Sequence, residues 1–238
     1  MRIGLFTDSY PPYINGVSTS VENLRNALTK LGHTVYVVTV NNSLTKWKYD
    51  ENTKILRIPG VPTRIYDYRL CNYYSHSIYK LIKSWNLDII HSHTEFGIGM
   101  LARKIAKKNK LPLVHTYHTL YEDYTHYVTK GHFNKFSKKV VKKLTIYFCK
   151  KTAQHTIVPT NKIDKLFKEK YDITENVSVI PTGINLDKFL KVNISKYAVK
   201  EIKEKYNILP SDYVIISVGR LAKEKNFEFL LKAHQQLL

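Results

Sequence analysis

The histidines of this sequence are concentrated in one segment. Six of the ten fall between positions 91 and 132. His91 and His93 stand at the end of one β-branched run, and His115 and His118 stand at the end of the next. Imidazoles in this arrangement suit a metal site, a set of buried or cleft histidines, or, at His118, a contact to a sugar or phosphate. Because no well-placed carboxylate set follows the His-x-His pair, we expect no metal.

A tyrosine-rich segment begins at His118. The stretch HTLYEDYTHY, residues 118–127, also carries Glu122 and Asp123. Aromatic hydroxyls beside carboxylates suit a sugar or lipid-glycerol acceptor, because they offer flat apolar faces together with hydrogen bonds. The same composition also fits a packed lid.

Two further places could hold a phosphate group. Gly16 stands between a strand and a helix, where the backbone can approach a ligand and the helix N-terminus offers free N–H groups to an anion. A plain turn before a capped helix, with Ser18 or Thr19 as the cap, is the alternative there. Arg220 and Lys225 follow a later strand and could clamp a diphosphate, although ion-paired surface residues would show the same pattern.

The residues from Gly97 to Ala102 match the Gly-x-Gly-x-x-Ala pattern of dinucleotide sites. The match follows a middle strand rather than the first, and no acidic ribose partner ends a second strand. Packing of a helix on a sheet explains small residues here, so we do not expect a dinucleotide.

Positive charge gathers around one helical pattern. Residues 101–170 carry 17 basic and 4 acidic residues, a net charge of +13 out of +19 for the whole chain. A basic amphipathic helix with aromatic residues is typical of membrane-surface binding, and a core-facing helix with a solvated lysine face or a nucleic-acid contact are the alternatives. The predicted core-facing sector is Phe133, Phe136, Val140, Val141, Leu144, Tyr147 and Phe148. The predicted membrane contacts are Phe133, Lys135, Phe136, Lys138, Lys139, Lys142 and Lys143.

The composition is that of a globular protein. The chain has 238 residues, of which 43% are hydrophobic and 24% are charged, so it can bury a core. Two distant cysteines exclude a disulfide framework and fit a reducing compartment. No apolar run of about 18 residues is present, and the N-terminus has the pattern of a first strand rather than of a signal peptide.

Short β-branched runs alternate with amphipathic stretches. Because the runs are apolar throughout, this order predicts an α/β fold with a Rossmann-like parallel sheet and helices on both faces. The predicted strands are 3–7, 34–40, 55–58, 88–92, 113–117, 156–158, 177–180 and 214–218. The predicted helices are 18–31, 70–85, 97–108, 133–151 and 161–171. Ligands bind such sheets at the carboxyl ends of the strands.

The pattern also predicts two domains. Residues 1–190 form the first domain, and residues 191–238 contain a linker and the start of a second. The strand at 214–218 and a helix from Asn226 begin this second β/α unit, and one strand with one helix cannot bury both faces. We therefore expect the second domain to be cut short.

Together these segments resemble the family of retaining, nucleotide-sugar-dependent glycosyltransferases built from two Rossmann-like domains. The resemblance rests on the Gly16 loop, the stretch HTYHT ending near His118, VIPTGIN at 179–185 and the segment GR…EKN at 219–226. Within that family, NGVSTS, HSHTEF and HTLYEDY look like enzymes that glucosylate diacylglycerol. The match covers the whole chain but only the first half of the family's length, and the family's paired-glutamate signature lies beyond Leu238.

The resemblance implies roles for individual residues. The Gly16 backbone, Arg220 and Lys225 would hold the donor diphosphate, and His118 would contact the transferred sugar as the catalytic residue. The family usually has two glycines in the first loop, whereas Asn15 precedes Gly16 here. The residues that we assign to acceptor binding are Asp8, Glu95, Tyr121, Glu122 and Tyr124.

The implied activity is transfer of a hexose, glucose by expectation, from UDP-glucose to a membrane lipid such as diacylglycerol. No cofactor is expected beyond this co-substrate. The expected partners are the nucleotide sugar and an anionic membrane, without nucleic acid, and the expected location is the inner face of a bacterial cell membrane, peripherally attached. This chain is expected to be inactive alone. The alternatives are a basic nucleic-acid-binding domain and a glycosyltransferase with a non-lipid sugar acceptor.

Overall fold

The computed structural model describes residues 1–62, 69–71, 75–118, 134–190, 194–219, 221 and 225–237, with the side chains of residues 70, 134–138 and 188 left out. The chain divides into two compact units, Met1–Asn185 and Leu186–Leu238. The first unit contains the sheet and the candidate site, and each unit is described by itself.

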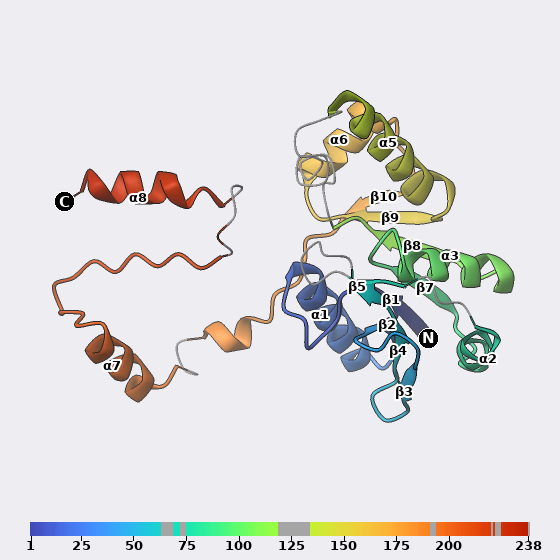
Figure 1. Ribbon diagram of the computed structural model, residues 1–238, viewed down its shortest axis with the longest axis horizontal. Coiled ribbons are helices and arrows are strands. Elements are labelled where there is room, and N and C mark those ends of the chain that lie inside the picture. The colour runs from blue at the N-terminus through green and yellow to red at the C-terminus, as the bar shows by residue number, and fades with distance from the viewer. Residues whose placement is uncertain are drawn as a thin grey trace. The chain divides into compact units, whose positions relative to one another are not determined.

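An eight-stranded sheet forms the centre of the first unit (Figure 1). All its neighbouring strands are parallel except β3, which is antiparallel to β4. The strand order is β10 (Val177–Val179), β9 (His155–Val158), β8 (Leu113–Thr116), β7 (Ile89–Ser92), β1 (Arg2–Phe6), β2 (Thr34–Asn41), β4 (Ile55–Pro59) and β3 (Lys48–Asp50). The strands β5 (Val61–Pro62) and β6 (Arg69–Leu70) form a separate antiparallel pair.

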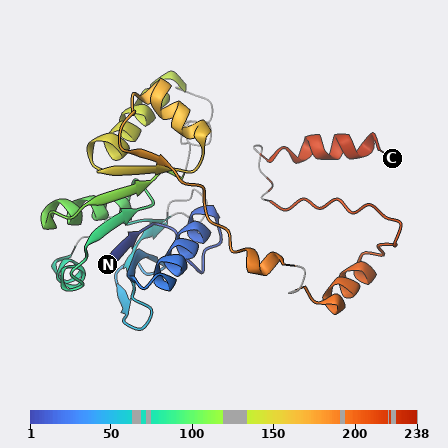
Figure 2. The same ribbon diagram turned by 180° about the vertical axis from the view of Figure 1, so that it is seen from behind.

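Helices cover both faces of this sheet, as Figure 1 and Figure 2 show from opposite sides. On one face, α2 (His76–Ser84) and α3 (Ile98–Asn109) pack on Phe6, Val38 and their neighbours. On the other face, α1 (Gly16–Lys30) packs on Leu5 and Val37. Because adjacent residues of one strand supply opposite cores, the strands are apolar throughout, as the sequence predicted.

A third core lies at the β8–β9–β10 end of the sheet. Phe148, Val158 and Phe167 are its buried centre. They come from the π-helix η1 (Tyr147–Lys151), which continues α5 (Asn134–Ile146), from β9, and from α6 (Asn161–Tyr171). The predicted parallel α/β fold is therefore confirmed, with three separate clusters of buried residues against one sheet.

Three local predictions were wrong. The helix expected from residue 70 begins only after Ser75, because the Ser75 hydroxyl accepts a hydrogen bond from the Ile78 amide at 3.2 Å and residues 69–70 pair in β6. The cap of α1 is Asn15 rather than Ser18 or Thr19, because its side chain accepts from the Ser18 amide. Residues 214–218 form no strand, and Ile216 is 82% exposed, because a strand needs a neighbour to hydrogen-bond with and the described residues supply none.

The second unit contains short helices. They are the 3₁₀ turn η2 (Leu186–Phe189), α7 (Lys196–Lys205) and α8 (Phe227–Gln235). No residue of α7 or α8 is buried, although both helices carry large apolar side chains such as Ile202 and Phe229. Their apolar surface is thus left uncovered by the residues that the structure describes.

The start of α3 depends on small residues. A methyl group on Gly99 would press on the Thr94 carbonyl oxygen and lie 2.6 Å from its carbon atom. Gly97 has a φ of +47°, and a methyl group there would lie 3.1 Å from Asp8 Cγ. The Gly-x-Gly pattern therefore serves the packing of α3 on the loop after β7, in agreement with the sequence interpretation.

We predict that Gly99→Ala destabilises the protein by about 1–3 kcal/mol or more, because the helix must move away from a backbone carbonyl. The matched control is Gly16→Ala at the start of α1, where nothing lies within 4 Å of the added carbon. This control should change the free energy of unfolding by less than about 1 kcal/mol. Urea unfolding monitored by circular dichroism measures both, and equal effects would contradict the packing role.

Candidate functional site

The candidate site lies where three neighbouring strands end. In the sheet register, Phe6 of β1 pairs with Ser92 of β7, and Ser92 pairs with His115 of β8. The residues that follow these positions therefore meet at the carboxyl edge of the sheet. They include the candidates Asp8, His93, Glu95 and His118. The edge is also where ligands bind in open α/β sheets.

Asp8 joins the end of β1 to the start of α3. Its Oδ1 accepts a hydrogen bond from the Ile98 amide at 2.8 Å, and its own amide donates to Thr94 Oγ1 at 3.2 Å. The side chain is buried, and burial raises its pKa from 3.8 to about 7, although hydrogen bonding of the carboxyl group to the Ile98 amide and the Thr94 side chain acts to lower it. Asp8 thus holds a helix and a loop together, and its predicted contact with an acceptor stays a prediction.

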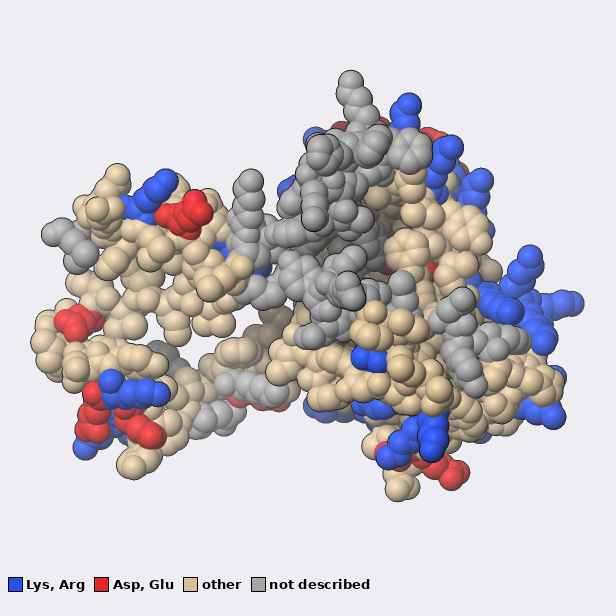
Figure 3. Space-filling model, in the orientation of Figure 1, with Lys and Arg blue, Asp and Glu red and all other residues tan. Residues whose placement is uncertain are grey.

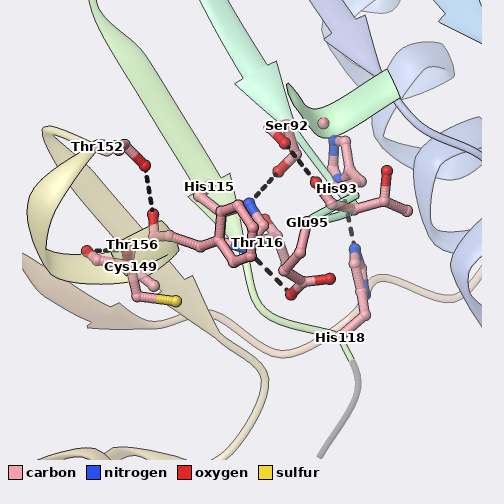
Figure 4. Close-up of polar contacts among 12 residues, drawn as sticks. Ser92, His93, Glu95, His115, Thr116, His118, Cys149, Thr152 and Thr156 are labelled. Carbon is pink, nitrogen blue, oxygen red and sulfur yellow. Dashed lines mark hydrogen bonds and ion pairs between the residues drawn. The ribbon is translucent and has the colours of Figure 1, made fainter. Parts of the chain in front are cut away.

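Glu95 is held inside the site by His115. The Nδ1 atom of His115 lies 3.0 Å from the Ser92 carbonyl oxygen, so this nitrogen carries the hydrogen, and Nε2 lies 3.3 Å from Glu95 Oε1. Both side chains are buried, and burial lowers the pKa of His115 although Glu95 opposes that shift. Figure 4 shows His115 directed between Ser92 and Glu95. The predicted acceptor role of Glu95 stays a prediction.

His118 is paired with His93. The Nδ1 atom of His93 lies 3.0 Å from Nε2 of His118, and Figure 4 shows the two rings directed toward each other. Burial lowers the pKa of His118 to about 4 and that of His93 well below its usual value. Both imidazoles are therefore neutral at physiological pH.

His91 completes a row of imidazoles. Its Nε2 lies 2.7 Å from Thr116 Oγ1, and its ring centroid lies 4.1 Å from that of His93. Burial lowers the pKa of His91 to about 3. Among the described residues, no group of three or more His, Cys, Asp or Glu side chains is arranged to hold a metal ion. Of the sequence alternatives, buried and cleft histidines match this geometry.

Arg103 is a part of the site's support that sequence analysis missed. This buried guanidinium donates to Ser92 Oγ, the Gly99 carbonyl and the Phe148 carbonyl, and its Cζ lies 4.6 Å from the Phe148 ring centroid. It also donates to Thr152 Oγ1 at 2.9 Å. Arg103 therefore ties β7 and α3 to η1. The sequence contained one signal for this role. Arg103 stands one helical turn after Gly99, and a small residue there lets the helix approach the neighbouring loop closely.

The remaining predicted site residues are not among these contacts or lie outside the described residues. Gly16 is exposed at the start of α1, and Lys225 is exposed in the second unit. No geometry relates them, because the two units are described separately. Five predicted site residues lie outside the described residues: Tyr121, Glu122, Tyr124, Phe133 and Arg220. The side chains of Lys135, Phe136 and Lys138 lie outside them too.

The basic helix is turned differently from the prediction. Leu144 packs on the third core and Thr145 is buried, whereas Val140 and Tyr147 are 40% and 42% exposed. The change of α5 into the wider π-helix at Tyr147 brings Phe148 and Cys149 inward and leaves Tyr147 outside. Val140 and Tyr147 thus stand outside the predicted core-facing sector.

Lysines dominate the surface around these exposed apolar residues. Lys139, Lys142 and Lys143 are exposed on α5. A groove of about 1420 Å³ is lined by Lys104, Lys107, Lys110 and Lys151 together with apolar residues of α3 and η1. Figure 3 shows blue side chains gathered over the regions of α3 and α5. We call α5 and the exposed lysines of this groove the basic face.

The fold is shared with a sugar-nucleotide-binding protein of known structure. The Anabaena protein HepE, solved in complex with UDP-glucose, matches with a TM-score of 0.62 at 13% identity. The match covers 99% of this chain and 57% of that protein. At this identity the likeness shows a shared Rossmann-like α/β fold.

The chain belongs to glycosyltransferase family 4, because the model of that family matches residues 14–188. It is 41% identical to an alpha-monoglucosyldiacylglycerol synthase of Acholeplasma laidlawii, over 98% of this chain and 59% of the relative. It is 38% identical to the enzyme of the same name from Streptococcus pneumoniae, over 100% of this chain and 53% of the relative. The chain thus spans somewhat more than half the length of these relatives. The predicted resemblance is confirmed.

Asp8 provides a test of the site's electrostatics. The Asp8 pKa is raised in the folded state, so the folded protein binds a proton that the unfolded chain releases above pH 3.8. The stabilisation that protonated Asp8 contributes is complete below pH 3.8 and is lost as the pH rises toward 7.

We predict that the wild type loses stability between pH 5.5 and pH 8, whereas Asp8→Asn, which cannot titrate at this position, does not. The free energy of unfolding of the variant minus that of the wild type should therefore be about 2 kcal/mol larger at pH 8 than at pH 5.5. Urea unfolding at both pH values measures this difference. Asp172→Asn is the control, because the Asp172 side chain is 91% exposed. A pH-independent difference between Asp8→Asn and the wild type would show that Asp8 is ionised in the folded protein.

Proposed function

We propose that this chain forms the acceptor-side half of a retaining hexosyltransferase that moves glucose from UDP-glucose to a diacylglycerol-type membrane lipid. The observation that carries the proposal is the 41% identity, along nearly the whole chain, to a protein named alpha-monoglucosyldiacylglycerol synthase. The buried, neutral imidazoles of His93 and His118 agree with it. The proposal includes no cofactor, since the nucleotide sugar is a co-substrate.

The donor would be held at the carboxyl edge of the sheet and by the second domain. Gly16 supports the first contact, because open space surrounds its Cα and the α1 N-terminus offers amide donors. Lys225, and Arg220 from the resemblance, would hold the diphosphate from the second domain. The protein HepE was solved with UDP-glucose, which supports a nucleotide sugar as the donor class.

The proposed reaction needs no protein nucleophile. The acceptor hydroxyl oxygen forms the new bond to C1 of the glucose, while the bond from C1 to the diphosphate oxygen breaks. The hydroxyl proton passes to an oxygen of the departing diphosphate, so UDP leaves and the sugar keeps its configuration. The protein would contribute positioning and stabilisation of the leaving group's charge.

The described site residues suit a reaction in which the protein positions the substrates and takes no proton itself. His118 is neutral at physiological pH and partly exposed, so it can hydrogen-bond a sugar hydroxyl without carrying charge. Asp8 and Glu95 are engaged with the Ile98 amide and His115, so we propose that they shape the acceptor side from within. Tyr121, Glu122 and Tyr124 are proposed acceptor contacts on the basis of sequence.

The basic face would bring the enzyme to its lipid. Lys139, Lys142 and Lys143 are exposed on α5, as is Val140, and Tyr147 adds an exposed aromatic ring one helical turn beyond Lys143. Lysines attract anionic headgroups, and an exposed apolar residue among them can enter the interface. No helix among the described residues is long and apolar enough to cross a membrane. We therefore propose peripheral attachment to the inner face of the cell membrane.

His118→Ala should lower turnover of the full-length enzyme by about 10²-fold or more, because a positioned hydrogen bond to the reacting sugar is lost. The assay is transfer of labelled glucose from UDP-glucose to diacylglycerol in vesicles. The melting temperature should change by only a few degrees, since the side chain is partly exposed and its hydrogen bond within the described residues is the one to His93. Normal turnover with a large loss of stability would instead assign His118 to the fold.

Reversing the α5 charges should weaken vesicle binding. The triple variant replaces Lys139, Lys142 and Lys143 by Glu. It removes three attractions of roughly 1 kcal/mol each to anionic headgroups, so binding to phosphatidylglycerol vesicles should fall by about 10²-fold or more. The matched control is Lys30, Lys46 and Lys48→Glu, which changes the same charge on exposed residues away from α5.

The control should bind within a few-fold of the wild type at 0.1 M salt, where exposed charges more than about 10 Å away are screened. Equal loss in both variants would show that net charge, and not the basic face, directs binding. Undiminished binding of the α5 variant would refute the membrane role of α5.

A further inference from the structure

We infer that His93 is a positioning residue that holds His118 in the tautomer with hydrogen on Nδ1, so that His118 offers the transferred sugar an N–H donor. This inference rests on the proposed function for its substrate, and on the geometry of the two rings for its chemistry. His93 itself touches neither sugar nor acceptor in this scheme.

The first step is the contact between the two rings. Nδ1 of His93 and Nε2 of His118 are 3.0 Å apart, which is hydrogen-bond distance. Two imidazole nitrogens form a hydrogen bond only when one carries hydrogen and the other has a lone pair. One of the two rings is therefore the donor, and the direction of the bond decides what His118 presents elsewhere.

The second step is the other nitrogen of His93. The His93 side chain is only 2% exposed, and its Nε2 is buried without a hydrogen-bond partner among the residues that the structure describes. A hydrogen on Nε2 would be a buried, unpaired N–H donor, and such groups are rare and cost about 1–3 kcal/mol. The favoured tautomer of His93 therefore carries its hydrogen on Nδ1 and donates it to His118.

His93 cannot easily turn to escape this arrangement. Its backbone amide donates to the Phe6 carbonyl at 2.8 Å, which fixes it beside β1. The His91 ring packs against the His93 ring with centroids 4.1 Å apart, and the centroid of the His118 ring lies 5.3 Å from that of His93. His91 is itself held by Thr116 Oγ1. These contacts hold the His93 ring in place at the edge of the sheet, with Nδ1 directed at His118.

The third step is the consequence for His118. Its Nε2 receives the hydrogen bond from His93, so a neutral His118 carries its own hydrogen on Nδ1. This Nδ1 has no partner in the described part of the chain, and the residue is partly exposed at the end of β8. The low pKa of His118, about 4, keeps the ring neutral at physiological pH.

This tautomer limits the roles that His118 can have in the reaction. With hydrogen on Nδ1, His118 donates to a sugar hydroxyl oxygen and has no lone pair left to accept a proton. It can orient the sugar, but it cannot act as a general base toward the acceptor. This matches a reaction in which the departing diphosphate takes the proton.

The test compares two amides at position 93. His93→Asn places an N–H donor near the position of Nδ1, whereas His93→Gln places its amide near the position of Nε2. In the full-length enzyme, His93→Asn should keep activity within about 5-fold of the wild type, and His93→Gln should lose about 10–100-fold in kcat. Circular dichroism melting must show that both variants fold, and His155→Gln, a sheet histidine bonded to Ser178, is the control.

The second measurement does not depend on glycosyl transfer. Nitrogen-15 NMR of histidine-labelled protein distinguishes protonated from lone-pair ring nitrogens, and His118→Gln assigns the signals. Wild-type His118 should show hydrogen on Nδ1 and a lone pair on Nε2, and His93→Asn should keep this pattern while His93→Gln should change it.

These outcomes separate the two hypotheses. Hydrogen on Nε2 of His118 in the wild type would overturn the inference, and so would a folded His93→Gln variant as active as His93→Asn. If the enzyme transfers no glucose to lipid, the proposed function fails, and the NMR result still decides the tautomer. If His93→Gln does not fold, the wild-type spectrum decides it.

Discussion

The hydrogen bond from the Ile98 amide to the Asp8 carboxyl group joins the first strand to the helix that covers its neighbours. It places a buried acceptor at the N-terminus of α3, and Gly97 and Gly99 let the helix approach the loops closely enough to form it. Because β1 lies between β2 and β7, this junction also sets where the loop after β7 stands. His93, Thr94 and Glu95 are on that loop. The geometry of the whole candidate site therefore depends on one tight contact between backbone and carboxyl group.

The site built on this junction is dominated by neutral groups. Burial lowers the pKa values of His91, His93 and His118, so these imidazoles, which often titrate near neutrality, serve here as uncharged hydrogen-bonding groups. Arg103 is the buried cation of the cluster, and it is committed to carbonyl and hydroxyl oxygens. Such an edge is suited to orienting hydroxyl groups rather than to exchanging protons. Family membership and this geometry support the same kind of chemistry, in which the protein positions and the substrates react.

Charge has a different place in the molecule. Many of the excess lysines lie on α3, α5 and η1, and Val140 and Tyr147 are exposed on the same segment as those of α5 and η1. The π-helical turn at Tyr147 makes this arrangement possible, because it buries Phe148 and Cys149 in the core while leaving Tyr147 outside. One continuous helical segment can then serve both the third core and an anionic surface. A regular amphipathic helix would have used the same aromatic residues only for packing.

The sequence by itself determined the parallel α/β class, most strands and helices, and the edge of the sheet where His91, His93, His115 and His118 gather. These follow from hydrophobic periodicity and β-branched runs, which are local properties of the chain. The short strands β3, β5 and β6 were not predicted, and residues 214–218 have strand composition without forming a strand, because pairing depends on a neighbour that composition does not reveal. Only the tertiary structure decided that Asp8 caps α3, that Glu95 faces His115, and that His93 bonds to His118. Such contacts join segments far apart in the sequence, and they exist only once strand order and register bring those segments together.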